Sequence, residues 1–556
     1  MRLDDLLHVL ATRLPEPPSI TPLHSELYAG LKDTAITQVT ADSRKVAPGS
    51  LFVALPGSKA DGHQFIERAI SSGASVIVVS ESKVSSLSAL VKDNHSIAIL
   101  KTSNTNRAFA GLVSAFMGMP AEKLTMIGVT GTNGKTTVTH LIERLLEDAG
   151  HSVGLIGTLG VRALKGCNPD RVVHENAEAT YDATGNTTPM ADELQQILSS
   201  FAQQAYQAIP LGSDSQTQST PAGISHVVME VSSHALDQSR VYGCDFKLAL
   251  ITNLTQDHLD YHKSMDAYCS AKERLFRALK NQPDRAAVIN LDDPWAYRFL
   301  AATPAHVSRW TYGLKSSEAN VRATDVDYKI NGTTFHLITP VGECRVSSKL
   351  GGRFGVYNTL AAIAAGLALN IPLECCVRSI EAVEGVRGRF EVVSQHPFVI
   401  VDYAHTPDGL QNVLEAARAV MKPQASSPDQ KSLGRLIAVF GCGGDRDATK
   451  RPKMGRIAEQ LADIQVVTSD NPRSEDPQQI LTDILSGIEH LDPKRTYVQP
   501  DRRTAIRLAI NLATHPNDVV VIAGKGHEDY QILPTGTIHF DDREEVQTYV
   551  AESVAV

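Results

Sequence analysis

The residues best suited to chemistry in this sequence form a glycine-rich loop that carries a lysine and two threonines, "GVTGTNGKTT" at residues 128–137. Gly131 and Gly134 let the backbone come close to a ligand, and the N–H groups at the start of the following helix can bind phosphate. The Lys135 ammonium can reach the β- and γ-phosphate oxygens of a nucleotide, and the Thr136 hydroxyl is a suitable ligand for Mg²⁺. These residue types predict a site for a nucleoside triphosphate.

The loop departs from the strict Walker pattern at one position, where Val129 stands in place of a glycine. A glycine turn that only joins a strand to a helix is the structural alternative, but a Gly-Lys-Thr-Thr run at such a junction favours phosphate binding. Phosphate binding alone does not decide whether the protein is a kinase, a GTPase, a motor protein or a ligase.

Two further side chains could hold a metal ion. Glu230 in "MEVSSHALDQSR" and His258 in "NLTQDHLDYH" follow apolar runs, so they should emerge at the carboxyl edge of a parallel sheet, where doubly wound folds bind ligands. Together they could form a second Mg²⁺ site, although Mg²⁺ prefers oxygen ligands, and taken singly each is more often a capping or hydrogen-bonded residue. The residues alone do not decide the role of Lys272, in "DAYCSAKERLF". A lysine on an amphipathic helix is usually a solvated surface charge.

Short apolar runs that alternate with amphipathic stretches predict an α/β protein of three units. Residues 1–122 are expected to form a small α/β unit that contains "SLFVALPG" and "ASVIVVS". Residues 123–393 hold the phosphate loop and near-continuous apolar runs, which predict a mostly parallel sheet. The pattern then restarts, and residues 394–556 predict a doubly wound unit. Two polar stretches, at about 162–185 and 202–225, interrupt the middle unit and are assigned no chemical role.

The composition of the whole chain excludes several classes of protein. A chain of 556 residues is too long for one hydrophobic core, and a net charge of −9 argues against nucleic-acid binding, which needs a basic face. The 7 cysteines show no CxxC spacing, so neither a zinc knuckle nor a disulfide framework is expected, and a reducing cytoplasm is the predicted location. No apolar run approaches the roughly 20 residues of a membrane helix, so no membrane insertion is expected.

A series of motifs resembles the Mur ligases in content and order, over nearly the whole chain. They include "DSRKVAPGSLFVALPGSKADGHQF", "GVTGTNGKTT", "MEVSSHALDQSRV", "TNLTQDHLDYH", "YCSAKERLF", "LGGRFGVYNTLAA", "GVRGRFE", "VDYAHTPDGL", "GCGGDRDATKRPKMG", "SDNPRSEDP" and "AGKGHEDYQ". The resemblance implies a uridine-nucleotide-binding domain, a central ATP-binding domain and an amino-acid-binding domain. It also implies an ATP- and Mg²⁺-dependent ligase of peptidoglycan precursor synthesis, which adds meso-2,6-diaminopimelate to UDP-N-acetylmuramoyl-L-alanyl-D-glutamate through an acyl phosphate.

The resemblance further implies roles for individual residues. The uridine nucleotide and its muramoyl dipeptide would be bound by Ser43, Ser58, Lys59, Ala60, Asn186, Thr187, Thr188, Ser232, Gln238 and Arg240. The residues implied for ATP are Gly131, Thr132, Asn133, Gly134, Lys135, Thr136, Thr137, Asn290, Asn358 and Arg389. Those implied for diaminopimelate are Arg446, Asp470, Asn471, Pro472, Arg473, Gly524 and Glu528.

The family's catalytic residues match Lys135, Glu230, His258 and Lys272. Lys272 aligns with a family lysine that reacts with CO₂ to give N6-carboxylysine, a carbamate. The resemblance implies that this carbamate binds Mg²⁺ together with Thr136, Glu230 and His258, because the modification turns a cation into an anion.

Arg473 in "SDNPRSEDP" favours diaminopimelate over L-lysine as the incoming amino acid. Diaminopimelate carries a second carboxylate for a buried guanidinium, whereas lysine would leave that arginine unpaired. A lysine-adding ligase of the same family is one alternative, and a ligase for other glutamyl acceptors such as folates is another. A non-catalytic nucleotide-binding scaffold is a third, against which the presence of Lys135, Glu230 and Lys272 argues.

Overall fold

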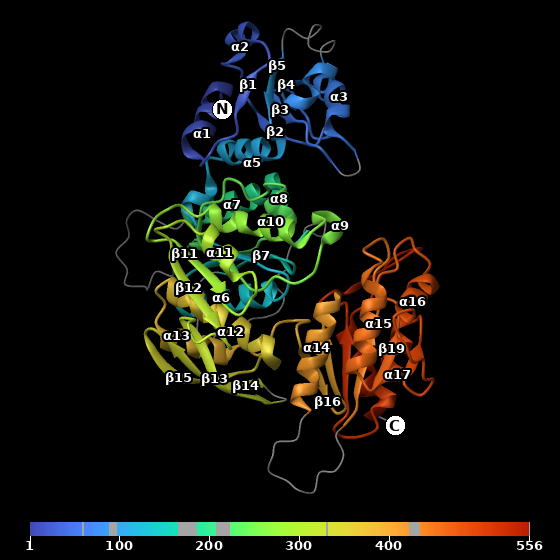
Figure 1. The fold of residues 1–556 in the computed structure, drawn as a ribbon. Helices are drawn as coiled ribbons and strands as arrows, with labels where there is room; N and C mark the ends of the chain where they lie inside the picture. The colour runs from blue at the N-terminus through green and yellow to red at the C-terminus, as the bar shows by residue number, and fades with distance from the viewer. Residues whose placement is uncertain are drawn as a thin grey trace, which may run out of the picture.

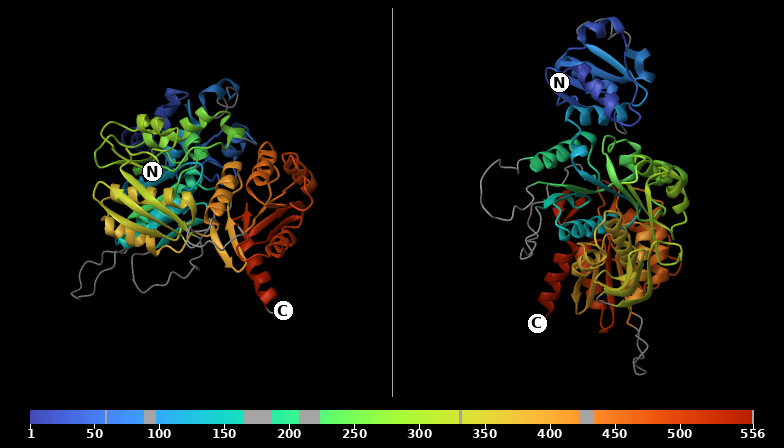
Figure 2. Two further views of the ribbon diagram at one scale, coloured as in Figure 1. Left: turned by 60° about the horizontal axis from the view of Figure 1, so that its bottom comes forward. Right: turned by 90° about the vertical axis from the view of Figure 1, so that its left-hand side faces the viewer.

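The computed structural model describes residues 1–57, 60–87, 97–164, 186–206, 223–329, 332–421 and 434–554. These residues form three large sheets, one after another along the chain, with helices packed against them, and a separate two-stranded sheet near the C-terminal end (Figure 1). The N-terminal unit stands on one end of the central unit, and the C-terminal unit lies against the side of the central unit (Figures 1 and 2). The predicted α/β class with mostly parallel sheets is confirmed. No helix among the described residues is long and apolar enough to cross a bilayer.

The N-terminal unit contains a five-stranded sheet of order β1-β5-β4-β3-β2, in which only β1 is antiparallel to its neighbour. Its strands are β1 (Ile20–Pro22), β2 (Gln38–Thr40), β3 (Ser50–Val53), β4 (Ala74–Ser80) and β5 (Ala98–Thr102). Its helices are α1 (Leu3–Arg13), α2 (Ser25–Leu31), α3 (Ile66–Ser71) and α5 (Thr105–Phe116). The predicted strands "SLFVALPG" and "ASVIVVS" correspond to β3 and β4.

The central unit contains a ten-stranded sheet of order β15-β14-β13-β12-β11-β10-β6-β9-β7-β8. Its strands are β6 (Thr125–Thr130), β7 (Val153–Gly157), β8 (Gly160–Leu164), β9 (His226–Glu230), β10 (Phe246–Ile251), β11 (Ala286–Asn290), β12 (Ser308–Gly313), β13 (Val321–Lys329), β14 (Gly332–Thr339) and β15 (Gly342–Ser348). Its helices are α6 (Lys135–Asp148), α7 (Ala191–Tyr206), α8 (Ser233–Asp237), α9 (Leu259–His262), α10 (Met265–Arg277), α11 (Ala296–Ala302), α12 (Gly352–Ala368) and α13 (Leu373–Ala382).

Helix α12 carries the contact between the central and C-terminal units. Most of its residues are buried, because it is apolar all round, as helices inside a protein are. It packs against α6 of its own unit and against α14 (Pro407–Val420) of the next. This placement brings the start of α14 close to the phosphate loop that precedes α6.

The C-terminal unit contains a six-stranded sheet of order β16-β17-β21-β18-β19-β20, with β16 antiparallel to β17 and the other pairs parallel. Its strands are β16 (Glu391–Gln395), β17 (Phe398–Asp402), β18 (Leu436–Phe440), β19 (Ile464–Val467), β20 (Thr496–Val498) and β21 (Val519–Ala523), followed by the hairpin β22 (Tyr530–Leu533) and β23 (Gly536–His539). Besides α14, its helices are α15 (Lys450–Leu461), α16 (Pro477–Leu485), α17 (Arg502–Leu512) and α18 (Asp542–Val554).

The structure differs from the sequence-based expectation in two respects. The third sheet already begins at Glu391, three residues before the expected restart at 394, because β16 pairs with β17 of that sheet. The three strands β13 to β15 form antiparallel pairs at one edge of the central sheet, and β8 pairs antiparallel with β7 at the other edge, which the apolar runs did not predict. Most of the two polar stretches expected at 162–185 and 202–225 lies outside the described residues.

A buried ion pair joins helices and strands of the C-terminal unit. The Arg502 guanidinium, in the first turn of α17, donates two hydrogen bonds of 2.7 Å to the Asp542 carboxylate at the start of α18. Both side chains are fully buried. The same guanidinium donates to the Ser469 carbonyl (3.4 Å) and the Ala523 carbonyl (3.2 Å), so it ties the carboxyl ends of β19 and β21 together.

We expect Arg502→Ala to lower the free energy of unfolding by about 3–5 kcal/mol, because it leaves a buried carboxylate without its partner. Arg503→Ala, on the same helix, removes a half-exposed guanidinium that pairs with Glu545 and lies 5.9 Å from the centre of the Phe540 ring, and it should cost only about 1 kcal/mol. Urea denaturation of both variants and the wild type measures the difference. Equal losses in the two variants would show that the buried pair has no special role in stability.

Candidate active site

The phosphate loop lies where the winding of the central sheet changes side. It connects β6 to α6, and the strands that flank β6 are β9 and β10, both parallel to it. The chain runs from β6 to β7 on one side of the sheet order and later crosses from β9 to β10 on the other. Ligands of doubly wound folds bind at the carboxyl ends of strands at such a point, which is where this loop lies.

Two glycines make the path of the loop possible. Gly131 has a φ of 142° and Gly134 a φ of 84°, conformations that residues with a Cβ rarely adopt. A Cβ on Gly131 would lie 1.9 Å from Thr252 Oγ1, and one on Gly134 would lie 2.5 Å from Asn358 Oδ1. Neither position therefore accepts a larger residue without movement of the neighbouring chain.

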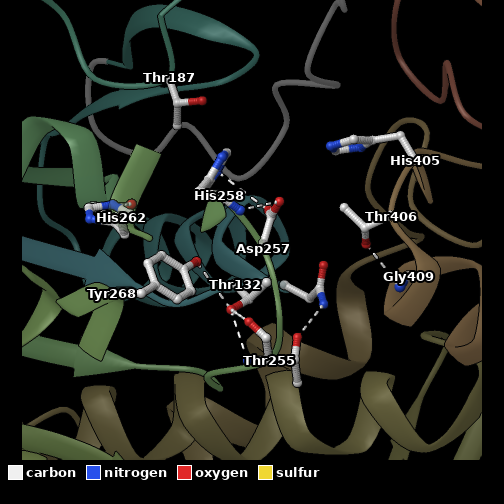
Figure 3. Close-up of polar contacts among 12 residues, drawn as sticks. Thr132, Thr187, Thr255, Asp257, His258, His262, Tyr268, His405, Thr406 and Gly409 are labelled. Carbon is white, nitrogen blue, oxygen red and sulfur yellow. Dashed lines mark hydrogen bonds and ion pairs between the residues drawn. The ribbon is translucent and has the colours of Figure 1, made fainter. Parts of the chain in front are cut away.

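The residues after β10 hold the loop from one side (Figure 3). The Thr132 hydroxyl donates to the Thr255 carbonyl (3.1 Å) and accepts from the Thr255 N–H (3.0 Å). It also lies 3.2 Å from the Tyr268 hydroxyl, and the Asn133 N–H donates to Asn253 Oδ1 (3.0 Å). The loop is thus hydrogen-bonded into a defined shape by its own unit.

Two lysines share a carbonyl group of the loop. Lys135 Nζ donates to the carbonyls of Gly131 (3.0 Å) and Thr132 (2.8 Å), and Lys272 Nζ donates to the same Gly131 carbonyl (2.9 Å). Lys272 is buried, unlike most lysines on amphipathic helices, so the structure decides what the residues alone left open. It lies on the buried stripe of α10 between Tyr268 and Phe276, four residues from each, a spacing that the sequence already contained.

This burial changes the chemistry of both lysines. Removal from water lowers the pKa of Lys272 well below its usual value, and the charge of Lys135 lowers it further. Burial also lowers the pKa of Lys135, against the opposing charges of Glu230 and Asp257. A desolvated lysine beside another cation can lose its proton and act as a nucleophile, which a solvated lysine does not do at neutral pH.

Glu230 ends β9 with a buried carboxylate, as its place after an apolar run predicted. One carboxylate oxygen accepts from the Thr158 N–H (3.0 Å), and the other accepts from the Thr158 hydroxyl (3.1 Å). That hydroxyl lies 3.2 Å from the hydroxyl of Thr187. Glu230 therefore lies between the phosphate loop and the segment that begins at Asn186.

His258 is the N-cap residue of α9 and has a left-handed φ of 54°, and its Nε2 lies 3.4 Å from Asp257 Oδ2 (Figure 3). Burial lowers the pKa of His258 to about 4, and the charge of Asp257 opposes this change. The charges of His234, Lys272 and Lys135 lower the pKa further. Within the described residues, no three His, Cys, Asp or Glu side chains are placed to hold a metal ion. A cation bound to Glu230 and His258 would therefore need oxygen ligands from other residue types.

Four residues that the family resemblance implied for the muramoyl dipeptide form one network beside Glu230. The Thr188 hydroxyl donates to the Glu230 carbonyl (2.8 Å) and accepts from the Ser232 N–H (3.0 Å). The Arg240 guanidinium donates to the Thr188 carbonyl (2.9 Å) and, from two of its nitrogens, to Gln238 Oε1 (3.0 and 2.8 Å). The fork of Arg240 is thus oriented by its own unit.

The residues implied for the uridine nucleotide belong to the N-terminal unit. Ser43 is buried in a turn where Asp42 accepts from the Arg44 N–H (2.9 Å) and pairs with the Arg44 guanidinium (2.8 Å). Ala60 is exposed, whereas Ser58 and Lys59 lie outside the described residues.

The three other residues implied for ATP contact the loop or its supports. Asn290 Nδ2 donates to the Thr252 carbonyl (2.9 Å), beside Gly131, and Asn358 lies against Gly134. Arg389, just before β16, donates to the Thr136 hydroxyl (3.1 Å). Its guanidinium lies 4.3 Å from the centre of the Tyr403 ring. The segment that joins the central and C-terminal units therefore touches the start of α6.

The C-terminal unit gathers a second polar cluster at the carboxyl ends of β19 and β21. Asn471 Nδ2 donates to Glu528 Oε2 (3.0 Å), and Asn471 Oδ1 accepts from the Ile532 N–H (2.9 Å). The buried Lys525 ammonium lies 3.2 Å from Asn471 Oδ1, 3.2 Å from Glu528 Oε2 and 3.7 Å from Asp470 Oδ1. Burial raises the pKa of Glu528, and the charge of Lys525 opposes that change.

Gly524, Pro472 and Arg473 border this cluster. A Cβ on Gly524, whose φ is 124°, would lie 3.3 Å from Asp470 Oδ2. Arg473 has a φ of 54° and donates from Nη1 to the Gly444 carbonyl (2.8 Å). Its side chain is half-buried, less than the sequence analysis expected, and Arg446 is exposed. Both guanidiniums can therefore meet a ligand from solution.

Sequence analysis missed several residues of these sites, among them Lys525 and Asp408. Lys525 lies two positions after the end of β21, and the rule that placed Glu230 at the carboxyl end of β9 would have found it. Asp408, in the first turn of α14, accepts hydrogen bonds from Asn133 (2.6 Å) and Thr255 (2.9 Å) of the central unit. An aspartate in a first helical turn is common, so no local signal pointed to this contact.

Comparison with known proteins places the chain in a family. Residues 35–116 match the model described as "Mur ligase family, catalytic domain". Residues 129–366 match "Mur ligase middle domain", and residues 388–526 match "Mur ligase, glutamate ligase domain". The three matches follow the order of the three sheets.

Individual relatives agree with these matches. The chain is 45% identical over 521 residues, 93% of this chain and 94% of the relative, to UDP-N-acetylmuramoyl-L-alanyl-D-glutamate–2,6-diaminopimelate ligase of Gloeobacter violaceus. A solved structure of a ligase with that name is 32% identical with a TM-score of 0.61, covering 94% of this chain and 96% of that one. MurF ligase from Thermotoga maritima in complex with ADP shares the fold, at 17% identity and a TM-score of 0.54 over 95% of this chain and 99% of that one. The chain belongs to the Mur ligase family.

Proposed function

We propose that this chain is an ATP-dependent ligase that joins meso-2,6-diaminopimelate to UDP-N-acetylmuramoyl-L-alanyl-D-glutamate in peptidoglycan precursor synthesis. The observation that carries the proposal is the match, over almost the whole chain, to relatives named for this reaction. The site geometry supports the proposal, because one chain contains a phosphate loop, the buried Glu230 carboxylate beside it, and a separate polar cluster around Lys525 that suits an amino acid. The N-terminal unit would bind the uridine nucleotide, the central unit ATP, and the C-terminal unit diaminopimelate.

The reaction would proceed in two steps. An oxygen of the D-glutamate γ-carboxylate attacks the γ-phosphorus of ATP, the bond to the β-phosphate oxygen breaks, and ADP leaves with an acyl phosphate formed. The neutral amine of diaminopimelate then attacks the acyl carbon, phosphate leaves, and the nitrogen loses a proton. Lys135 and Arg389, both beside the loop, would offset the charge that develops during phosphoryl transfer.

The residues around Lys272 fit a carbamate. The neutral amine that burial favours can attack CO₂, which forms an N–C bond, releases a proton and leaves an anion beside the Lys135 ammonium. That anion would supply the oxygen ligands that Glu230 and His258 lack. We infer that Thr136, Glu230, His258 and the carbamate hold Mg²⁺, which when bound would neutralise phosphate charge.

The C-terminal cluster suits an amino acid with two zwitterionic ends. The half-buried Arg473 guanidinium can bind the distal carboxylate in a bidentate manner, and Glu528 with Asp470 can accept from the distal ammonium. L-lysine lacks that carboxylate and would leave Arg473 unpaired. The C-terminal unit must approach the acyl phosphate to deliver this amine. That approach would also exclude water from the acyl phosphate.

The deciding experiment measures phosphate release from ATP with the UDP-muramoyl dipeptide and either diaminopimelate or L-lysine. Release that depends on both the dipeptide and diaminopimelate supports the proposal. Preference for lysine would identify the lysine-adding alternative, turnover with a folate acceptor would identify a folate ligase, and nucleotide binding without turnover would identify a scaffold.

Lys272→Ala should lower turnover by roughly 100-fold, because it removes an anion that binds the metal. A short carboxylic acid such as propionate should restore part of the activity by occupying the place of the carbamate. Lys280→Ala is the matched control, since Lys280 is exposed and pairs with Asp245, away from the phosphate loop. Full activity of Lys272→Ala would show that the buried amine serves the fold alone.

Arg473→Ala should weaken diaminopimelate binding by roughly 30-fold or more, because one charge-assisted contact of about 2–5 kcal/mol is lost. Lysine should gain little, since removal of a penalty does not build a site for its ammonium. Arg473→Lys should recover only part of the affinity, because an ammonium lacks the planar fork. The measurement is the ratio of kcat/KM for the two amino acids, and an unchanged ratio would mean that Arg473 only supports the Gly444 carbonyl.

A further inference from the structure

Helix α14 of the C-terminal unit reaches the phosphate loop of the central unit through one carboxylate. The Thr406 hydroxyl caps α14 by accepting from the Gly409 N–H (3.0 Å), which places Asp408 in the first turn. Asp408 Oδ2 accepts from Asn133 Nδ2 (2.6 Å) and from the Thr255 hydroxyl (2.9 Å). Figure 3 shows Thr406 and Gly409 at the start of α14 lying across from Thr132 and Thr255. We call the contact of Asp408 with Asn133 and Thr255 the Asp408 bridge.

The Asp408 bridge fixes the side chain of Asn133, which the central unit by itself holds only weakly. The backbone of Asn133 is fixed by its own unit, because its carbonyl accepts from the Thr252 hydroxyl (2.6 Å) and from Asn253 Nδ2 (3.0 Å). Its side chain has a contact of 3.5 Å with the Thr255 hydroxyl within that unit, and a contact of 2.6 Å with Asp408. The shorter contact comes from another unit, 275 positions along the chain.

The strength of the hydrogen bonds in the Asp408 bridge depends on the position of α14. A carboxylate that accepts from neutral donors forms charge-assisted hydrogen bonds, which are stronger than neutral ones but depend on short distances. Asn412, one turn along α14, donates to the same oxygen (3.1 Å) and orients it from within the helix. Arg389 makes a second contact between the joining segment and the loop, at Thr136, so the loop is held from the C-terminal side at two points.

We propose that Asp408 is a positioning residue through which the C-terminal unit orders the phosphate loop, so that nucleotide binding and docking of α14 favour one another. The inference rests on the proposed function only in that the loop binds ATP. Coupling of this kind is reciprocal: whatever factor docking adds to nucleotide affinity, the nucleotide adds to docking. The loop then takes its phosphate-binding shape when α14 of the C-terminal unit is docked. ATP use is thereby linked to the position of the unit that binds the amino acid.

The test compares Asp408→Ala and Asp408→Asn with Glu415→Ala in the full chain. Glu415 lies on the same helix, is exposed, and contacts Gln411 (2.8 Å) at the surface. Affinity for ADP is measured by calorimetry, KM for ATP by phosphate release, and compaction on ADP addition by small-angle X-ray scattering. We expect Asp408→Ala to weaken ADP binding about tenfold, raise KM for ATP similarly and reduce the compaction. Asp408→Asn, which keeps one acceptor oxygen, should lie between, and Glu415→Ala should match the wild type.

A double variant separates coupling from simple stability. Thr255→Val should weaken ADP binding in the wild-type chain but add little in Asp408→Ala, because both remove the same bridge. Unchanged ADP affinity in Asp408→Ala, or a lower melting temperature with unchanged ADP affinity, would overturn the proposal. A wild-type chain that binds ADP but shows no turnover with diaminopimelate would contradict the proposed function and leave the ADP measurements to decide on Asp408, so the two failures are distinguishable.

Discussion

The carbonyl group of Gly131 is the point on which the rest of the site depends. It accepts hydrogen bonds from two lysines, Lys135 in the loop and Lys272 on α10, and so joins the loop to a helix that lies far along the chain. The arrangement requires a glycine, because the φ of 142° and the contact with Thr252 leave no room for a Cβ. A single backbone conformation thus brings the two basic side chains together.

Two ammonium groups at one carbonyl would repel each other if both were charged. Burial lowers the pKa of both lysines, that of Lys272 well below its usual value, whereas the carboxylates of Glu230 and Asp257 oppose the change at Lys135. One lysine is thereby suited to remain a cation beside phosphate, and the other to become a nucleophile. The same residue type serves two kinds of chemistry because the surroundings differ, not the side chain.

The C-terminal unit repeats this principle with other residues. Lys525 lies among Asp470, Asn471 and Glu528, so a buried cation orders a cluster of acceptors. Arg502 holds the strand ends below that cluster through the carbonyls of Ser469 and Ala523. The two clusters belong to different sheets, and the contacts of Arg389 and Asp408 with the loop connect them. The geometry of the whole site therefore depends on how α14 packs beside α12.

The sequence by itself determined the class of fold, most strands of the three sheets and the phosphate loop. Each rests on local information: apolar runs of strand length, glycines at a turn, and a Lys-Thr pair at the start of a helix. It also placed Glu230 and Arg473 after strands, because side chains there emerge at the edge where ligands bind. These features depend on residues within a few positions of one another.

Only the tertiary structure decided the burial of Lys272, the start of the third sheet at Glu391, the antiparallel edge from β13 to β15 and the Asp408 bridge. An amphipathic helix has two faces, and the packing of α10 against the loop decided that Lys272 points inward. A strand at a sheet edge is defined by its partner, which for β16 is β17. The contact between Asp408 and Asn133 spans 275 positions, and no local pattern contains a distance of that kind, because it is set by how separately folded units pack.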